Sequence, residues 1–460
     1  MLAAALAATV LAAPGPHDPL PAQPLGGRGE PSAPQPSRPA SRTKDGPTEF
    51  ELENGLKVLL EAEPGPPWVA IATAYRAGDR DEPRDRPGLA HLFEHLSFDA
   101  APEALGIDLR RHIESAGGYI NAGTGRETTS YYAEVPVTEL DVLLRIELQR
   151  MANPSAEMTR RALRLERKVV QEEQRLRFDE TDMLQDRVQQ EALFGPAHPL
   201  TPPNRDVALE VGQHRLEDAR WFGETFYRPD RAAIAITGSF DAEAVRARIL
   251  ALFGTIPSLP PTSRPDPIPA VTHGRKEVIL HRSIVWEQHF QLLKLSQRVP
   301  WAAAQIAESL LSRRIGRALL RVSHSCHTTF YLYRDAGVLE VDVIPAANRT
   351  LHSVAKLTAE ALAEALGEVH AGPEIDGARR REIYAERRRV SSRLSRARSA
   401  AAALLRGDPA SHESRLAALS EVSPEALTEL VRALEKGPQL ALSLKDDPKR
   451  FRPFLEVVTP

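Results

Sequence analysis

The spacing of apolar residues changes along the chain, and each spacing predicts a different element. Apolar residues on both sides of Asn54-Gly55 predict a hairpin with strands at 50–53 and 56–60. The apolar run 68–75 predicts the next strand. Further strands are predicted at 128–135 and 231–237. Helices are predicted at 108–116, 137–151 and 156–178, and another that follows residues 238–241 and ends near Phe253. This mixture predicts an α+β fold.

The pattern after residue 273 repeats this plan. Strands are predicted at 276–281, 289–295 and 337–344, and long helices at 351–369 and 375–405. The apolar segment 439–444 near the end resembles the segment 231–237. Five prolines between Ser258 and Ala270 predict a linker at 258–272. The chain is therefore expected to hold two α+β halves, 48–257 and 273–460.

The first 47 residues show no periodicity of a folded domain. The apolar run at 1–13 has the length of a signal-peptide core, and the Pro-rich stretch 14–47 predicts a disordered tether. We therefore expect export, to the periplasm or the medium. The alternative is a cytoplasmic protein with a low-complexity tail, since no Lys or Arg precedes the run.

Composition excludes several classes of protein. A net charge of -3 argues against binding to a polyanion. Cys326 is the only cysteine, so neither a disulfide within the chain nor a thiolate zinc cluster can form. No stretch after the N-terminus is apolar enough to span a membrane. A metal would therefore be held by histidine and carboxylate.

One short stretch offers such ligands. Residues 88–96 predict a helix that carries the pattern His91-x-x-Glu94-His95. Histidines four apart lie above one another on a helix and can bind one metal ion. Glu94 lies close enough to take a proton from a metal-bound water. This is the inverted zincin pattern, and the alternative is a solvated helix that happens to carry two histidines.

A catalytic zinc site usually takes three protein ligands, so a third donor is needed. Glu166 and Glu173 are seven residues apart and therefore share one face of a predicted helix. Helices as highly charged as this one are usually only solvated, so the spacing alone leaves the ligand open.

The chain resembles the pitrilysin/insulinase family of zinc metallopeptidases, which includes the mitochondrial processing peptidase. The resemblance covers 48–257 in order. Its segments are Ala77-Gly78-Asp79-Arg80-Asp81-Glu82, residues 88–98, Gly117-Gly118-Tyr119-Ile120-Asn121-Ala122, Thr128-Thr129-Ser130-Tyr131-Tyr132, residues 166–173, residues 237–241 and residues 253–257.

The resemblance implies a site and a fold. His91, His95 and Glu173 would bind Zn2+, with Glu94 as general base and Glu166 as a supporting carboxylate near the site. Glu172 is the rival third ligand, and Glu173 is preferred because it keeps the seven-residue offset from Glu166. Asn121 and Ala122 would lie on an edge strand that pairs with extended substrate. Each half would be a mixed or antiparallel sheet with helices packed on it.

The second half departs from the family pattern. Residues 321–341 lack the usual segment with its substrate-binding Arg and Tyr; Tyr331, Tyr333 and Arg334 are candidate substitutes, or else strand and turn residues. A short two-domain chain of this family implies a dimer, and the divergence suggests a related partner subunit that supplies the Arg and Tyr. His324 and His327 form a loop pair without a nearby carboxylate, which argues against a second metal site.

The Arg-rich stretch 379–398 is interpreted as a solvated helix or a partner contact, not as a nucleic-acid site, because its charges alternate with Glu382 and Glu386.

The predicted function is that of a zinc-dependent endopeptidase that hydrolyses peptides or unfolded protein segments. The alternatives are a catalytically silent structural or assembly subunit and a peptide-binding partner of a related peptidase. Silent relatives typically lose the metal residues, and this chain keeps all of them.

Overall fold

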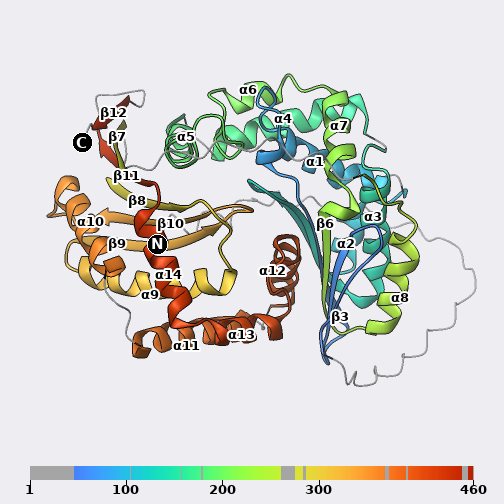
Figure 1. Ribbon diagram of the computed structural model, residues 1–460. Helices are drawn as coiled ribbons and strands as arrows, with labels where there is room; N and C mark the ends of the chain where they lie inside the picture. Colours follow the sequence, from blue (N-terminus) through green and yellow to red (C-terminus); the bar gives the residue numbers. More distant parts are fainter. Residues whose placement is uncertain are drawn as a thin grey trace, which may run out of the picture. The chain divides into compact units, whose positions relative to one another are not determined.

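The computed structural model describes residues 46–103, 105–156, 158–177, 180–260, 275–282, 286–367, 372–389, 392–447 and 454–458 (Figure 1). The expected signal peptide at 1–13, nearly all of the tether at 14–47 and most of the linker at 258–272 lie outside the described residues. Within the described part, no helix combines the length and the apolar character needed to cross a membrane.

A six-stranded mixed sheet forms the first half. Its strands follow the order β1-β2-β6-β3-β5-β4, and only the β2–β6 pair is parallel. The strands are β1 Thr48–Glu51, β2 Lys57–Ala62, β3 Trp68–Tyr75, β4 Tyr119–Thr124, β5 Thr129–Pro136 and β6 Ala232–Gly238. The central strands β3 and β6 are buried on both faces, whereas β4 lies at the edge. The Asn54-Gly55 turn joins β1 to β2 as predicted, with Gly55 at φ +87°.

The first half contains the helices that build the main core on one face of this sheet and one helix, α5 (Glu180–Phe194), that packs on the second sheet. They are α1 Leu89–Glu103, α2 Leu109–Ser115, α3 Leu140–Ala152, α4 Arg160–Arg177, α5 Glu180–Phe194, α6 Val207–Val211, α7 Leu216–Phe226 and α8 Ala242–Phe253. This half also has three short 3-10 helices, at Asp79–Asp81, Val137–Glu139 and Pro229–Arg231. The apolar faces of β3, β5, α1, α3 and α7 share one buried cluster.

The second half repeats the sheet. Its order, β12-β7-β11-β8-β10-β9, matches the first sheet position by position, with the parallel pair β7–β11 in the place of β2–β6. The strands are β7 Arg275–Arg282, β8 Gln288–Leu295, β9 Ser323–Leu332, β10 Gly337–Pro345, β11 Gln439–Asp446 and β12 Phe454–Val458. The helices are α9 Trp301–Leu319, α10 Leu351–Gly367, α11 Gly372–Arg389, α12 Arg393–Arg406, α13 His412–Glu421 and α14 Pro424–Lys436.

This architecture confirms the predicted fold class of two similar α+β halves. The segments 231–237 and 439–444 do occupy equivalent strands, β6 and β11.

Each sheet is covered on its other face by a helix from the opposite half of the chain. Helix α12 lays a row of alanines, among them Ala397, Ala400 and Ala401, against alanines of β3 and β6 such as Ala72 and Ala235. Helix α5 packs Leu193 and Phe194 against Leu292 and Leu442 of the second sheet. Alanines on both surfaces allow the α12 backbone to approach the first sheet closely.

Several elements of the second half differ from the sequence prediction, and β9, β12, α13 and α14 were not predicted at all. The single helix predicted at 375–405 is wrong: α11 and α12 are separate, and Ser392 adopts an extended backbone whose hydroxyl accepts a bond from Ser395 N. An N-cap of this kind starts a new helix. Helix α9 was not predicted, although Ile306, Leu310 and Leu311 follow helical spacing and are buried.

Candidate metal centre

The N-terminus of α1 is fixed by a carboxylate from the loop that precedes it. Glu82 accepts hydrogen bonds from Gly88 N at 2.9 Å and from Ala90 N at 2.7 Å. Gly88 has φ +81°, and a Cβ there would lie 2.5 Å from Val211 Cγ2. Both the backbone angle and the close contact therefore require glycine. This arrangement sets where α1 begins, two residues before His91.

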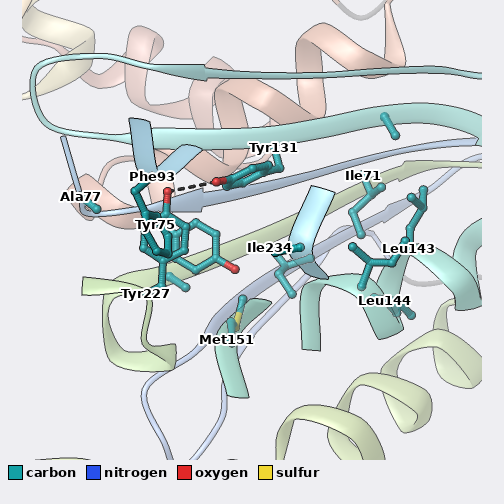
Figure 2. Close-up of a cluster of buried hydrophobic side chains, with 14 of the residues drawn as sticks. Ile71, Tyr75, Ala77, Phe93, Tyr131, Leu143, Leu144, Met151, Tyr227 and Ile234 are labelled. Atoms are coloured by element: carbon teal, nitrogen blue, oxygen red, sulfur yellow. Dashed lines mark hydrogen bonds between the residues drawn. The ribbon is translucent and has the colours of Figure 1, made fainter. Parts of the chain in front are cut away.

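Aromatic residues pack beneath α1 (Figure 2). The Phe93 ring lies 4.4 Å from the Tyr227 ring, which stacks on Tyr75 at 4.2 Å with 21° between the planes. The hydroxyls of Tyr131 and Tyr227 are 3.1 Å apart, joined by the hydrogen bond drawn in Figure 2. All four side chains are buried. Since Phe93 faces this core, the flanking histidines are turned to the other side of the helix.

His91 and His95 face Glu173 of α4. His91 Nε2 lies 3.5 Å from Glu173 Oε2, and His95 Nε2 lies 3.8 Å from the same oxygen. One nitrogen or oxygen atom from each of the three side chains falls within 4.8 Å of the other two. Tetrahedral zinc ligands about 2.0–2.2 Å from the ion lie roughly 3.3–3.6 Å from each other. Two imidazole nitrogens and one carboxylate oxygen at this spacing fit a zinc ion after small side-chain adjustments.

Two further side chains contact the outer nitrogens of the imidazoles. His95 Nδ1 lies 3.0 Å from Glu166 Oε2, and His91 Nδ1 lies 3.4 Å from the side-chain amide of Gln174. Burial alone would lower the pKa of His95, but the Glu166 hydrogen bond and the nearby charges of Glu94 and Glu173 outweigh it, so the pKa is raised. Partners of this kind orient histidine ligands and fix their tautomer.

Glu94 lies between the two histidines in the sequence and is 7% exposed. Its Oε2 accepts a hydrogen bond of 2.6 Å from Thr124 Oγ1, at the end of β4. The Tyr131 hydroxyl donates to the backbone carbonyl of Glu94 at 3.4 Å. The carboxylate is thus held by the edge strand as well as by its own helix.

The structure separates Glu173 from the rival ligand Glu172. Glu172 is exposed and pairs with Arg175 at 2.7 Å, on a different side of α4 from the histidines. Glu166 and Glu173 both face α1, as their seven-residue spacing predicts. Sequence analysis did not identify Thr124, Gln174 or Glu82, because no spacing rule connects them to the histidine motif.

Asn121 and Ala122 lie on the edge strand β4, whose neighbour among the described strands is β5. The Asn121 side chain accepts a bond from Ala122 N at 2.8 Å and donates to the Tyr119 hydroxyl at 3.1 Å. Asn121 therefore covers a backbone donor that a pairing strand would use.

Two family models match the chain. The model for insulinase, peptidase family M16, matches residues 57–197, and the model for the M16 inactive domain matches residues 215–376. The chain belongs to the insulinase family, M16. The first match contains the histidine motif and Glu173, and the second starts just before α7 and runs into α11.

Curated relatives of this M16 chain carry similar names. An uncharacterized zinc protease of Mycobacterium leprae is 27% identical over 335 residues, which cover 66% of this chain and 72% of the relative. The probable β subunit of the mitochondrial processing peptidase of Arabidopsis thaliana is 30% identical over 215 residues, 46% of this chain and 39% of that protein. The chain thus matches less than half the length of this second relative.

Solved structures share the fold of this M16 chain. A protease from Helicobacter pylori superimposes with a TM-score of 0.73 at 19% identity, covering 87% of this chain and 99% of that one. The periplasmic protease PqqL from Escherichia coli gives 0.66 at 18% identity, covering 89% of this chain but 48% of its own. This M16 chain therefore has the size of half of the longer protease.

A cavity of about 870 Å³ lies beside the histidine motif of this M16 chain. His91, Thr124 and Gln174 line it, as do Tyr331, Tyr333 and Arg334 from the second half. Arg334 is already paired: its guanidinium donates two bonds to Asp81, at 3.1 and 2.8 Å, and one to Glu127 O at 2.6 Å. Tyr331 bonds Glu340, and Tyr333 packs edge-on against Phe194. The candidate substitutes thus line the cavity, with Arg334 held by ion pairs.

The prediction that His324 and His327 form a loop pair is wrong. His324 and His327 lie on strand β9, not in a loop; the His324 ring stacks on Trp286, and His327 lies opposite Asp342. Among the described residues, the side chains grouped closely enough to hold a metal ion are those of His91, His95 and Glu173.

The Arg-rich stretch divides between α11, which ends in three exposed arginines, and α12, whose Arg393 and Arg396 pair with Glu134 and Glu63 of the first half. Its α12 part therefore contacts the same chain and is not simply solvated.

Proposed function

We propose that this chain is a zinc-dependent endopeptidase. The observation that supports it most directly is the convergence of His91 Nε2, His95 Nε2 and Glu173 Oε2, with the Glu94 carboxylate on the same turn of α1. His91, His95 and Glu173 would hold the ion. A bound zinc ion would supply Lewis-acid chemistry, which acidifies water and polarises a carbonyl group.

Glu94 is the proposed general base. A carboxylate held in a mostly buried position can accept a proton from the attacking water and later donate it to the leaving amine. Its hydrogen bond from Thr124 and its place on the same turn of α1 as the histidines keep it beside the proposed zinc site. Glu166 would act indirectly, by orienting His95 through Nδ1.

The proposed substrates are peptides or unfolded protein segments. An exposed edge strand such as β4 can bind an extended chain through backbone hydrogen bonds, with little demand on its sequence. Asn121 and Ala122 would take part once the Asn121 side chain moves off Ala122 N. The cavity of about 870 Å³ beside His91 gives room for substrate side chains next to the scissile bond.

We further propose that the active species is a dimer. This chain covers 48% of the longer periplasmic protease, so two chains would match its length. Because Arg334 is engaged with Asp81 and Glu127, a second, related subunit is the proposed source of the substrate-binding Arg and Tyr. Size analysis that finds activity only in a monomer would contradict this. Export remains a prediction from residues 1–13, which secretion of a tagged full-length chain would test.

The test uses full-length protein purified from its native host, with any partner that co-elutes. We expect about one zinc per chain and cleavage of an unfolded, fluorescently labelled polypeptide that stops on chelation and returns with zinc. Glu94→Gln should keep its zinc and lose about 10²–10⁴-fold in turnover. The alternatives predict other results: a silent assembly subunit binds partner without cleavage, and a peptide-binding partner retains peptide intact. Wild-type turnover in Glu94→Gln would refute the proposal.

A further inference from the structure

Three oxygen atoms connect Glu94 to the backbone of the first sheet. Thr124 Oγ1 lies 2.6 Å from Glu94 Oε2 and 3.1 Å from Thr129 Oγ1, and Thr129 Oγ1 lies 2.9 Å from the carbonyl of Ala77. Thr124 and Thr129 are direct partners in the β4–β5 ladder. The chain of hydroxyls therefore runs across two strands and ends at the loop after β3.

The direction of these hydrogen bonds follows from the donors available. A backbone carbonyl can only accept, so Thr129, which is fully buried, donates its single proton to Ala77. Thr124 then has one proton and two acceptors, the Glu94 carboxylate and the Thr129 oxygen. A carboxylate is the stronger acceptor, and a distance of 2.6 Å is typical of a bond from a hydroxyl to an ionised oxygen. Thr124 therefore donates to Glu94.

The position of Thr124 gives this bond its significance. Thr124 ends the strand that carries Asn121 and Ala122, and it also lines the cavity beside His91. Glu94 itself belongs to α1, on a different element. Without the Thr124 bond, the three side-chain torsions of Glu94 would be set by α1 and its neighbours alone. With it, the carboxylate keeps a fixed place relative to the edge strand.

We propose that Thr124 is a positioning residue, which holds the Glu94 carboxylate in register with the edge strand on which the substrate pairs. This rests on the proposed function, because it takes Glu94 as the base and β4 as the substrate strand. Misplacement of a reacting group by about 1 Å can cost 10²-fold in rate. Loss of the Thr124 hydroxyl should therefore reduce turnover while substrate binding and metal binding stay intact.

The test compares Thr124→Val, Thr124→Ser and Thr73→Val in full-length, zinc-loaded protein. Valine has nearly the shape of threonine but no hydroxyl, whereas serine keeps the hydroxyl. Thr73 is a matched control: it is fully buried on β3 of the same sheet, and its Oγ1 makes no hydrogen bond among the described residues. Thr73→Val repeats the chemical change away from Glu94.

We expect Thr124→Val to lose about 10–100-fold in kcat, with KM and zinc affinity within about threefold of wild type. Thr124→Ser should recover most of the loss, and Thr73→Val should behave as wild type. A crystal structure of zinc-loaded Thr124→Val should show the Glu94 carboxylate displaced while His91, His95 and Glu173 keep their places.

Two results would overturn the proposal. One is an undisplaced Glu94 carboxylate in Thr124→Val, a result that does not depend on activity. The other is a Thr124→Val loss that serine fails to restore or that follows zinc affinity, since either would mean a structural role. Failure of the proposed function is a separate result: wild-type protein that neither cleaves polypeptide nor differs from Glu94→Gln.

Discussion

The carboxylate of Glu166, on α4, lies 3.0 Å from Nδ1 of His95, on α1. Glu166 is seven residues before Glu173 on the same helix. A single face of α4 therefore contributes both a proposed ligand and the group that orients another. With Glu166 accepting the proton on Nδ1, His95 is held in the tautomer whose Nε2 is available to a metal. The supporting contact and the ligand set thus depend on the same helix packing.

Removing that contact should weaken metal binding without abolishing it. We expect Glu166→Ala to lower zinc affinity by about 10–100-fold, because His95 would lose its fixed orientation. Competition with a chelating dye measures this directly. Glu172→Ala is the matched control on the same helix, where the side chain is exposed and pairs with Arg175. Equal losses in the two variants would contradict the assignment of Glu166.

A second prediction concerns the buried ion pair beneath α1. Arg150 is 2% exposed, pairs with Glu147, donates to Ser97 Oγ at 3.2 Å and lies 3.7 Å over the Tyr131 ring. Arg150→Met would leave the Glu147 carboxylate buried without its cation. We expect a loss of about 3–5 kcal/mol in the free energy of unfolding, measured by denaturant titration.

The control for Arg150 is a solvent-exposed ion pair on the surface of α4. Arg175 and Glu172 are more than half exposed, so Arg175→Met should cost about 0–1 kcal/mol. If Arg150→Met were as mild as Arg175→Met, the buried pair would contribute little to the packing that supports the histidine helix.

The fold could be predicted where the signal was local. A few residues of sequence are enough to recognise the Asn54-Gly55 turn, the apolar run of β3 and the His91-x-x-Glu94-His95 helix. Glu173 is preferred over Glu172 on the family resemblance together with its seven-residue offset from Glu166, since the spacing alone leaves the ligand open. The repeat of the plan in the second half followed from equivalent strands such as β6 and β11.

Contacts between distant segments could not be predicted in the same way. Arg396 pairs with Glu63, and Thr124 with Glu94, across separations that no periodicity links. The break between α11 and α12 depends on the Ser392 cap, which the many arginines and alanines on both sides of it concealed. Arg334 was considered for substrate binding because its pairing with Asp81 is visible only in three dimensions.

His198, which follows α5, should make the free energy of unfolding depend on pH. Burial, followed by the positive charge of Arg80, lowers the pKa of His198 to about 4, and its Nδ1 accepts a bond from Leu200 N at 3.0 Å, which requires the neutral ring. Between pH 6.5 and 4 the unfolded chain binds a proton at this histidine that the folded chain does not. Stability should therefore fall as the pH is lowered through this range.

His198→Asn tests this pH dependence. Asparagine can accept the Leu200 bond but does not titrate, so the decline in unfolding free energy between pH 7 and pH 4.5 should be shallower than in wild type. Denaturant titrations at several pH values measure it. A variant that follows the wild-type slope throughout would show that other groups control the acid limb.

The last prediction concerns two adjacent ion pairs between the β9–β10 turn and the loop before α1. Arg334 binds Asp81, and Asp335 binds Arg80 at 3.0 and 2.6 Å, so adjacent charges of the β9–β10 turn meet adjacent charges of the loop before α1. Their surroundings differ: the Asp81 side chain is 10% exposed and that of Asp335 is 48% exposed.

The exposure of each carboxylate should decide how much its ion pair contributes to the free energy of unfolding. Arg334→Met should cost about 1–3 kcal/mol in the free energy of unfolding, because it removes charged hydrogen bonds from the poorly hydrated Asp81. Asp335→Asn should cost about 0–1 kcal/mol, since Asp335 is well hydrated and Arg80 keeps Glu127 at 2.6 Å. Urea titrations at about 0.05 M and 1 M salt separate the two: screening should erase the Asp335→Asn effect and leave most of the Arg334→Met effect. Equal costs at both salt concentrations would mean that burial does not govern how this turn is held against the loop before the histidine helix.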